Sequence, residues 1–153
     1  MILLDNELNG YRQYILPMAC ENEVLRRAVS VAATAHLSPN IPELDAPGKA
    51  GRSAIITKLV KDASEGPSSQ LSGETIWATI ILLLVSDLVT GSEDFSISYR
   101  MLVSFTQAKK DSLKDSPLKD FLMEQTELYG YCPTFHFPPL LIYSLASTSL
   151  HSQ

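Results

Sequence analysis

The apolar segment from Glu74 to Val89, ETIWATIILLLVSDLV, constrains the fold more than any other part of the chain. Its aliphatic residues and Trp77 would cover every side of a helix, and such a helix has to be enclosed by other elements or by lipid. The uninterrupted apolar run ends at Ser86 and Asp87, short of the roughly 18 to 20 residues that span a hydrocarbon core. We therefore expect a buried helix over about residues 74–90, at the centre of a protein core.

Both ends of this helix carry local signals. Ser72 is placed to cap the first turn, and Glu74 lies at the positive end of the helix dipole. Gly91 can adopt the left-handed conformation that ends a helix. A buried strand over Ile80 to Val85 is the alternative, but the caps and the total length favour a helix.

Hydrophobic residues at helical spacing predict five further helices. The second of these is rich in alanine on its apolar face, and small side chains allow close packing, which we expect to be against the Trp77 helix. The expected ranges are Leu3–Leu16, ended by Pro17; Asn22 to His36, with Asn22 as N-cap; 50–63; Ser92 to about Lys110; and Ser116 to Gly130, with Pro117 in the first turn.

Two polar stretches between these helices are predicted to be irregular. Three prolines and a glycine make Ser38–Gly48 a loop, and Ser64–Gly73 is a polar connection into the central helix. The fold class that follows is all-α, an array of about six antiparallel helices around the central one. We expect a helical domain over residues 1–131 and a proline-containing tail over 132–153.

Composition excludes several classes of function. With 153 residues, of which 45% are hydrophobic, the chain can form one domain with a core. A net charge of −5 disfavours direct contact with nucleic acid. Cys20 and Cys132 lack the spacing of a zinc site and are expected to be reduced thiols. We expect no metal site, no cofactor and no membrane insertion.

Asp87 is the most informative charged residue, because it lies among the apolar residues that end the central helix. A buried carboxylate has to be paired or have its pKa shifted. Pairing with Arg26, Arg27 or Arg100 would make it structural. We favour such a pair, or an exposed position at the end of the helix, over catalysis in a cavity near Asp87 and His36.

Other candidate residues have structural interpretations. His36 ends the second predicted helix, where an imidazole can cover terminal carbonyls, and His136 is expected to be packed or solvated. Gly48 and Lys49 lack the other residues of a phosphate-binding loop, and GRS at 51–53 lacks those of a serine-hydrolase motif. Trp77 is expected in the core. We therefore predict no catalytic residue and leave any ligand-binding residues unassigned.

The order of the segments resembles the fungal-specific transcription factor domain, the regulatory region that follows a zinc binuclear-cluster DNA-binding domain. The resemblance rests on YRQYILPMACENEVLRRAVSVAATAHLS, GRSAIITKLV, ETIWATIILLLVSDLVTG and YRMLVSF, between about residues 11 and 131. Tyr99 stands near the position of a tryptophan in that family, whose following histidine and Gly-Ala pair are absent here. The sequence also lacks the six-cysteine DNA-binding cluster.

This resemblance implies a non-catalytic regulatory domain that acts in the nucleus through protein contacts or a small-molecule effector. Its expected partners are a second copy of the chain, forming a homodimer, or the transcriptional machinery, without direct nucleic-acid binding. The alternative is a helical protein-interaction scaffold unrelated to transcription, which the same amphipathic pattern would serve. A small helical enzyme is disfavoured, because no set of polar groups converging on one cavity can be identified in the sequence.

Overall fold

The computed structural model describes residues 9–66 and 71–130, and every regular element in those ranges is a helix. The all-α prediction is therefore confirmed. In chain order the elements are η1 (Tyr11–Ile15), α1 (Leu16–Glu21), α2 (Glu23–Leu37), η2 (Pro42–Leu44), α3 (Asp45–Glu65), α4 (Gly73–Thr90), α5 (Phe95–Lys109), η4 (Lys110–Ser112) and α6 (Pro117–Gly130). The expected tail over 132–153 lies outside the described residues.

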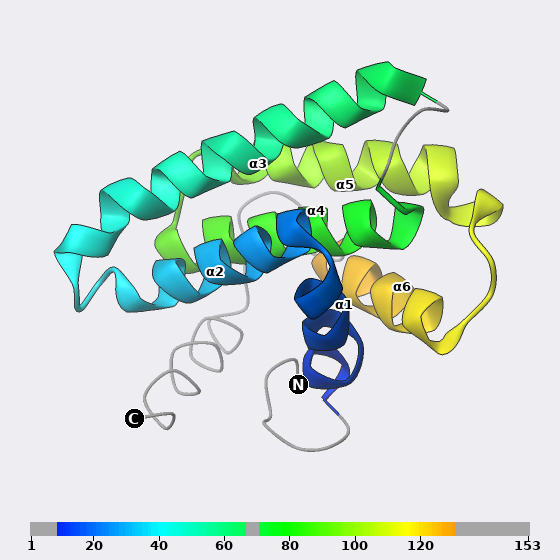
Figure 1. The fold of residues 1–153 in the computed structure, drawn as a ribbon, viewed down its shortest axis with the longest axis horizontal. Helices are drawn as coiled ribbons and strands as arrows, with labels where there is room; N and C mark the ends of the chain where they lie inside the picture. Colours follow the sequence, from blue (N-terminus) through cyan, green and yellow to red (C-terminus); the bar gives the residue numbers. More distant parts are fainter. Residues whose placement is uncertain (1–8, 67–70, 131–153) are drawn as a thin grey trace.

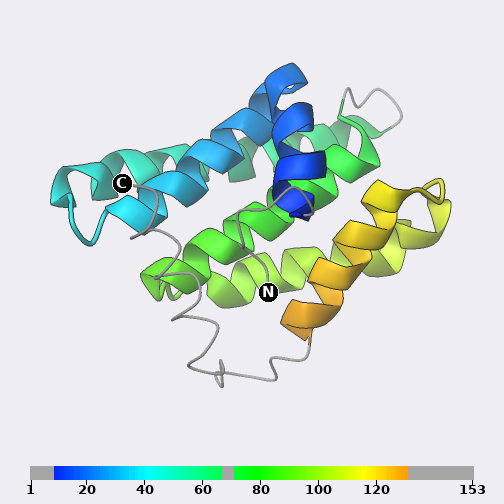
Figure 2. The ribbon, with the colours of Figure 1, turned by 90° about the horizontal axis from the view of Figure 1, so that it is seen from below.

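The long helices form two neighbouring hairpins, α2 with α3 and α4 with α5 (Figures 1 and 2). Helices α2 and α4 pack extensively against each other and run in the same direction, while α3 and α5 run the opposite way. Helix α6 packs against α4 across the end of the second hairpin. The turns of both hairpins thus lie at the same end of the molecule.

Helix α4 is the most deeply buried element. It has the length and hydropathy of a membrane span, but 67% of its residues are buried inside the protein, as in the core helix of a soluble fold. It packs against α2, α5 and α6. The predicted caps are confirmed: Ser72 Oγ accepts from the backbone N–H of Thr75, and Gly91 has a φ of 64° in the left-handed region.

The alanine-rich face of α2 packs against α4, as expected. Ala28 is fully buried, and Ala32 and Ala35 are less than 10% exposed. Asn22 caps this helix, since its Oδ1 accepts from the N–H of Leu25 at 3.0 Å. Small side chains at these positions let α2 lie close to the central helix, which places the hairpins side by side.

Pro17 does not end the first helical segment, contrary to the sequence prediction. The chain passes from the π-helical turn Tyr11–Ile15 directly into α1, and Pro17 lies in the first turn of α1. Proline is compatible with the first turn of an α-helix, here one that directly follows a π-helical turn. The predicted part before residue 9 lies outside the described residues.

The start of α3 was also predicted incorrectly. The helix begins at Asp45, not at about residue 50, so it includes Pro47 and Gly48 that were assigned to a loop. Pro47 falls within the first turn, where proline is compatible with a helix. Further along, Gly51 lies against α2, and a Cβ there would come within 3.0 Å of Val31 Cγ2. Glycine therefore allows the close approach of α2 and α3.

Helix α5 begins at Phe95, three residues after the predicted start at Ser92. Ser92 instead forms a turn, in which its Oγ accepts from the N–H of Asp94. The predicted start of α6 is confirmed, because Pro117 is its first residue and Ser116 Oγ accepts from the N–H of Lys119 at 3.1 Å. The late start of α5 leaves a short polar turn between α4 and α5.

Polar contacts join α6 to the rest of the core. Trp77 Nε1 donates to Thr126 Oγ1 at 2.9 Å, and the hydroxyl of Tyr11 donates to Gln125 Oε1 at 3.1 Å. The ring of Tyr11 also packs edge-on against Phe121. Burial raises the pKa of Tyr11 well above its ordinary value, and the neighbouring Tyr129 raises it further.

Candidate ligand pocket

A pocket of about 610 Å³ lies where the two hairpin turns meet. Its walls come from the end of α2, the start of α3, the end of α4 and the turn that leads into α5. The volume falls within the range of about 300–1,000 Å³ that is usual for small-molecule sites. The pocket is lined by apolar side chains, such as Val31 and Leu44, and by charged ones.

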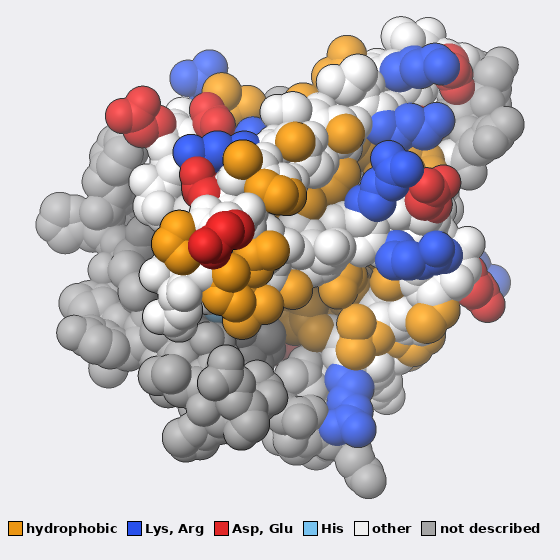
Figure 3. Space-filling view, turned by 60° about the vertical axis from the view of Figure 1, so that its left-hand side comes forward, with side chains coloured by type: hydrophobic (Ala, Val, Ile, Leu, Met, Phe, Trp, Pro, Cys, Tyr) orange, Lys and Arg blue, Asp and Glu red, His pale blue; other side chains and the backbone are white. Residues whose placement is uncertain are grey.

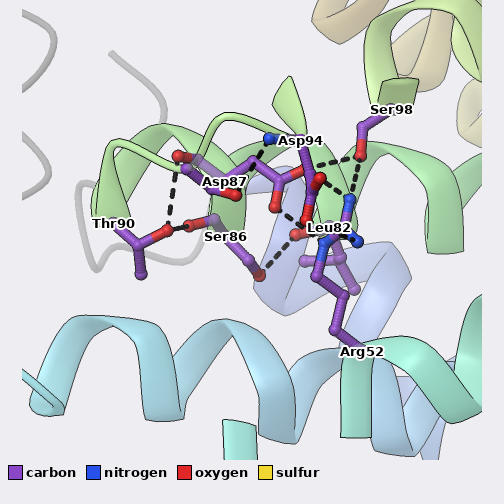
Figure 4. A network of polar contacts seen from close by, with 8 residues as sticks. Arg52, Leu82, Ser86, Asp87, Thr90, Asp94 and Ser98 are labelled. Atoms are coloured by element: carbon purple, nitrogen blue, oxygen red, sulfur yellow. Dashed lines mark hydrogen bonds and ion pairs between the residues drawn. The ribbon is translucent and has the colours of Figure 1, made fainter. Parts of the chain in front are cut away.

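A two-point ion pair between Arg52 and Asp87 forms one wall of the pocket (Figure 4). Arg52 Nε donates to Asp87 Oδ1 at 2.8 Å, and Arg52 Nη2 donates to Asp87 Oδ2 at 2.9 Å. The side chain of Asp87 is 2% exposed and that of Arg52 is 14% exposed. Parallel donation of this kind fixes the planes of both groups, so the pair holds α3 in a defined position on α4.

Helix α5 contributes two further partners to this pair. Ser98, which is fully buried, donates its hydroxyl proton to Asp87 Oδ2, and its oxygen accepts from Arg52 Nη2 at 2.9 Å. Asp94, which is more exposed, lies 3.6 Å from Arg52 Nη1. Arg52 therefore contacts α4 and α5 together, and it links the first hairpin to both helices of the second (Figure 4).

The expected structural pairing of Asp87 exists, but the expected partners were wrong. Arg26 donates to the carbonyls of Ala19 and Cys20, and Arg27 pairs with Glu23 on the surface. Arg100 is exposed. Arg52 was expected to face outward from the helix predicted over 50–63, but its side chain is only 14% exposed. It reaches from α3, which packs on α2, to Asp87 at the end of α4.

The structure does not bring His36 together with Asp87 at the pocket. Asp87 lines the pocket, whereas His36 is not among its lining residues. Burial lowers the pKa of His36 from its ordinary value of 6.5. The carbonyl of Ala35 near the end of α2 accepts from Ser38 Oγ at 3.3 Å, so Ser38 supplies a capping contact that was expected from the imidazole.

The pocket contains charges of both signs. Besides Arg52 and its partners Asp87 and Asp94, the pocket is lined by Lys49 and Asp45, which pair at 3.1 Å, and by Glu93. Acidic and basic side chains lie close together on the face that Figure 3 brings forward. Within the described ranges, no group of three or more His, Cys, Asp or Glu side chains could hold a metal ion. The pocket therefore presents both hydrogen-bond donors and acceptors.

The remaining sequence candidates lie elsewhere. Trp77 is fully buried in the core, as predicted, and Cys20 is an exposed thiol. Cys132 and His136 lie outside the described residues. Ser98 was not identified from the sequence. The one available signal was its spacing, since it is a polar residue on the same face of α5 as Phe95 and Leu102.

Comparison of the chain with family models, curated proteins and solved structures found no match.

Proposed function

We propose that this chain is a non-catalytic regulatory domain of a fungal transcription regulator, which acts in the nucleus through protein contacts or an effector. The proposal is supported by the segment order that resembles the fungal-specific transcription factor domain. The pocket at the hairpin turns gives it a physical basis, since a ligand there would contact both hairpins.

The observation that carries the proposal is the position of Arg52. It joins α3 to Asp87 on α4 and to Ser98 on α5, at the wall of the pocket. A ligand changes a conformational equilibrium only if it binds one arrangement better than another. A molecule that spans this wall would favour one relative position of the hairpins. The positions of helix surfaces far from the pocket would then change as well.

The same geometry favours binding over catalysis. Both oxygens of Asp87 and two nitrogens of Arg52 already make short hydrogen bonds within the protein. A general acid or base has to reach a substrate proton, and a carboxylate occupied on both oxygens is poorly placed to do so. These groups are therefore suited to fix the shape of the pocket wall.

A reporter assay tests the proposal. The full chain is fused to an unrelated DNA-binding domain in fungal cells that carry the matching reporter gene. We expect the fusion to enter the nucleus and to change reporter transcription relative to the DNA-binding domain alone. Ser53→Trp, which would obstruct the pocket from α3, should alter that effect. Ala50→Trp is the matched control, since Ala50 is exposed on the same helix and does not line the pocket.

Two results would contradict the proposal. One is an unchanged reporter with a folded, nuclear fusion protein. The other is tight, salt-resistant binding of the chain alone to a specific DNA duplex.

Crosslinking to partners outside the nucleus would favour the alternative, a helical interaction scaffold. Exposed large apolar side chains are the observation behind that alternative; Leu16, Ile41, Val60 and Ile97 are each more than 40% exposed.

A further inference from the structure

A second hollow lies between α2 and α3, away from the hairpin turns. Its volume is about 240 Å³, and it is formed by the first turns of α2 and the middle of α3. The floor includes Val24 and Ile55, which are buried, and Ala54. This volume is below the roughly 300 Å³ at which sites for drug-sized molecules begin. Its size suits one large apolar side chain.

Basic side chains surround this apolar floor. Arg27, Lys58 and Lys61 line the hollow with one acidic residue, Glu23. Lys58 and Lys61 form no ion pair within residues 9–66 and 71–130. Glu23 pairs with Arg27, but both side chains are more than 60% exposed, and such a surface pair is easily exchanged for another partner. Figure 3 shows several basic side chains on the right of the view, with a few acidic ones beside them.

We propose that this hollow is a docking site for an acidic segment of a partner protein, which inserts one large apolar side chain between α2 and α3. The chain carries a net charge of −5, whereas the hollow is lined by three cations and one carboxylate, so an acidic segment is attracted to this local basic site. A second copy of the chain would bring its own net charge of −5, which opposes it as the occupant. The apolar floor favours a peptide over a free anion.

This inference concerns a site separate from the ligand pocket, and its test does not use the reporter. The probe is a short fluorescein-labelled peptide of Asp, Glu and Ser residues with one central Phe, and its binding to the full chain is followed by fluorescence anisotropy. We expect saturable binding that weakens with rising salt. Replacing the central Phe of the peptide with Ala should abolish most of the binding, because the floor then has no occupant.

Two pairs of variants locate the site. Lys58→Glu combined with Lys61→Glu should weaken peptide binding about tenfold or more. Lys109→Glu combined with Lys114→Glu makes the same change in net charge at exposed residues outside the hollow and should leave binding nearly unchanged. Ala54→Phe should fill the hollow and block the peptide, whereas Ala50→Phe should not. Circular dichroism melts check that each variant is folded.

Several outcomes would overturn the proposal. Absence of peptide binding to the unmodified chain is the first, and equal weakening by both lysine pairs is the second. Equal binding of a peptide with Lys in place of its acidic residues would remove the electrostatic argument. Displacement of the peptide by inorganic phosphate or by duplex DNA at constant ionic strength would instead identify a general anion site.

Discussion

Arg52 on α3 and Asp87 on α4 form a two-point ion pair, with Nε–Oδ1 and Nη2–Oδ2 distances of 2.8 and 2.9 Å, although 35 residues separate them in the chain. Ser98 on α5 completes the contact. The pair is therefore the polar junction of three helices at the wall of the pocket. Its contribution to folding and its place in the pocket can be tested separately.

Arg52→Ala should destabilise the protein, because it leaves the buried carboxylate of Asp87 without its cation. Removal of one member of a buried pair typically costs about 3–5 kcal/mol, and we expect the lower end because Arg52 is 14% exposed. Urea unfolding measures the change. Arg27→Ala, which breaks an exposed pair, should cost about 0–1 kcal/mol. Equal effects of the two substitutions would show that the buried pair has no special role.

Replacement of both partners should be less harmful than the sum of the single changes. In Arg52→Leu with Asp87→Leu neither charge remains buried, and the apolar side chains can pack against the end of α4. A double-mutant cycle measures the coupling between the two sites. Additive losses in the cycle would contradict the geometry of the pair.

Thr126→Val should cost about 1–3 kcal/mol, because the buried N–H of Trp77 loses its acceptor on α6. Thr106→Val is the control. Thr106 also donates to a carbonyl four residues earlier in its helix, but the indole N–H of Trp77 donates to Thr126 and not to Thr106. Trp77 is the chain's single tryptophan, so fluorescence during urea unfolding reports directly on this part of the core. The prediction fails if the two threonine variants unfold alike.

Ala28→Leu should destabilise the contact between α2 and α4 by about 1–3 kcal/mol, because extra methylenes in a filled core force side chains or backbone to move. Ala28 is fully buried. Ala33→Leu places the same side chain on the exposed face of α2 and should change stability by less than about 0.5 kcal/mol. Thermal melts of the two variants measure the difference, and a well-tolerated leucine at residue 28 would contradict close packing there.

His36 should make the protein sensitive to mild acid. Burial lowers its pKa in the folded state below the ordinary value of 6.5, so the unfolded chain takes up this proton first. The stabilisation is present above pH 6.5 and is lost as the pH falls through the lowered pKa. Urea midpoints at several pH values below 6.5 should decrease more for the unmodified chain than for His36→Gln. Parallel decreases in the two proteins would assign the acid effect to other groups.

Local sequence signals determined the helical class, the central helix and most helix ends. Ser72, Gly91, Asn22 and Ser116 act within a few residues of their own position, and their side-chain or backbone preferences are the same in any fold. The periodic alanines of α2 likewise identified a face for close packing. The errors at Pro17 and at the start of α3 arose because proline is compatible with the first turn of a helix.

The tertiary structure alone decided which helix faces meet and therefore which polar groups become neighbours. The sequence indicated that Asp87 needs a cation, but several arginines could have supplied it. Arg52 was selected because α3 packs on α2 and its long guanidinium side chain extends to the end of α4 and the first turn of α5, where it reaches both Asp87 and Ser98. The same holds for the ligand pocket and for the hollow between α2 and α3, because each is lined by residues from different helices. The packing of the helices sets the distances between those residues, and no single segment of the sequence encodes them.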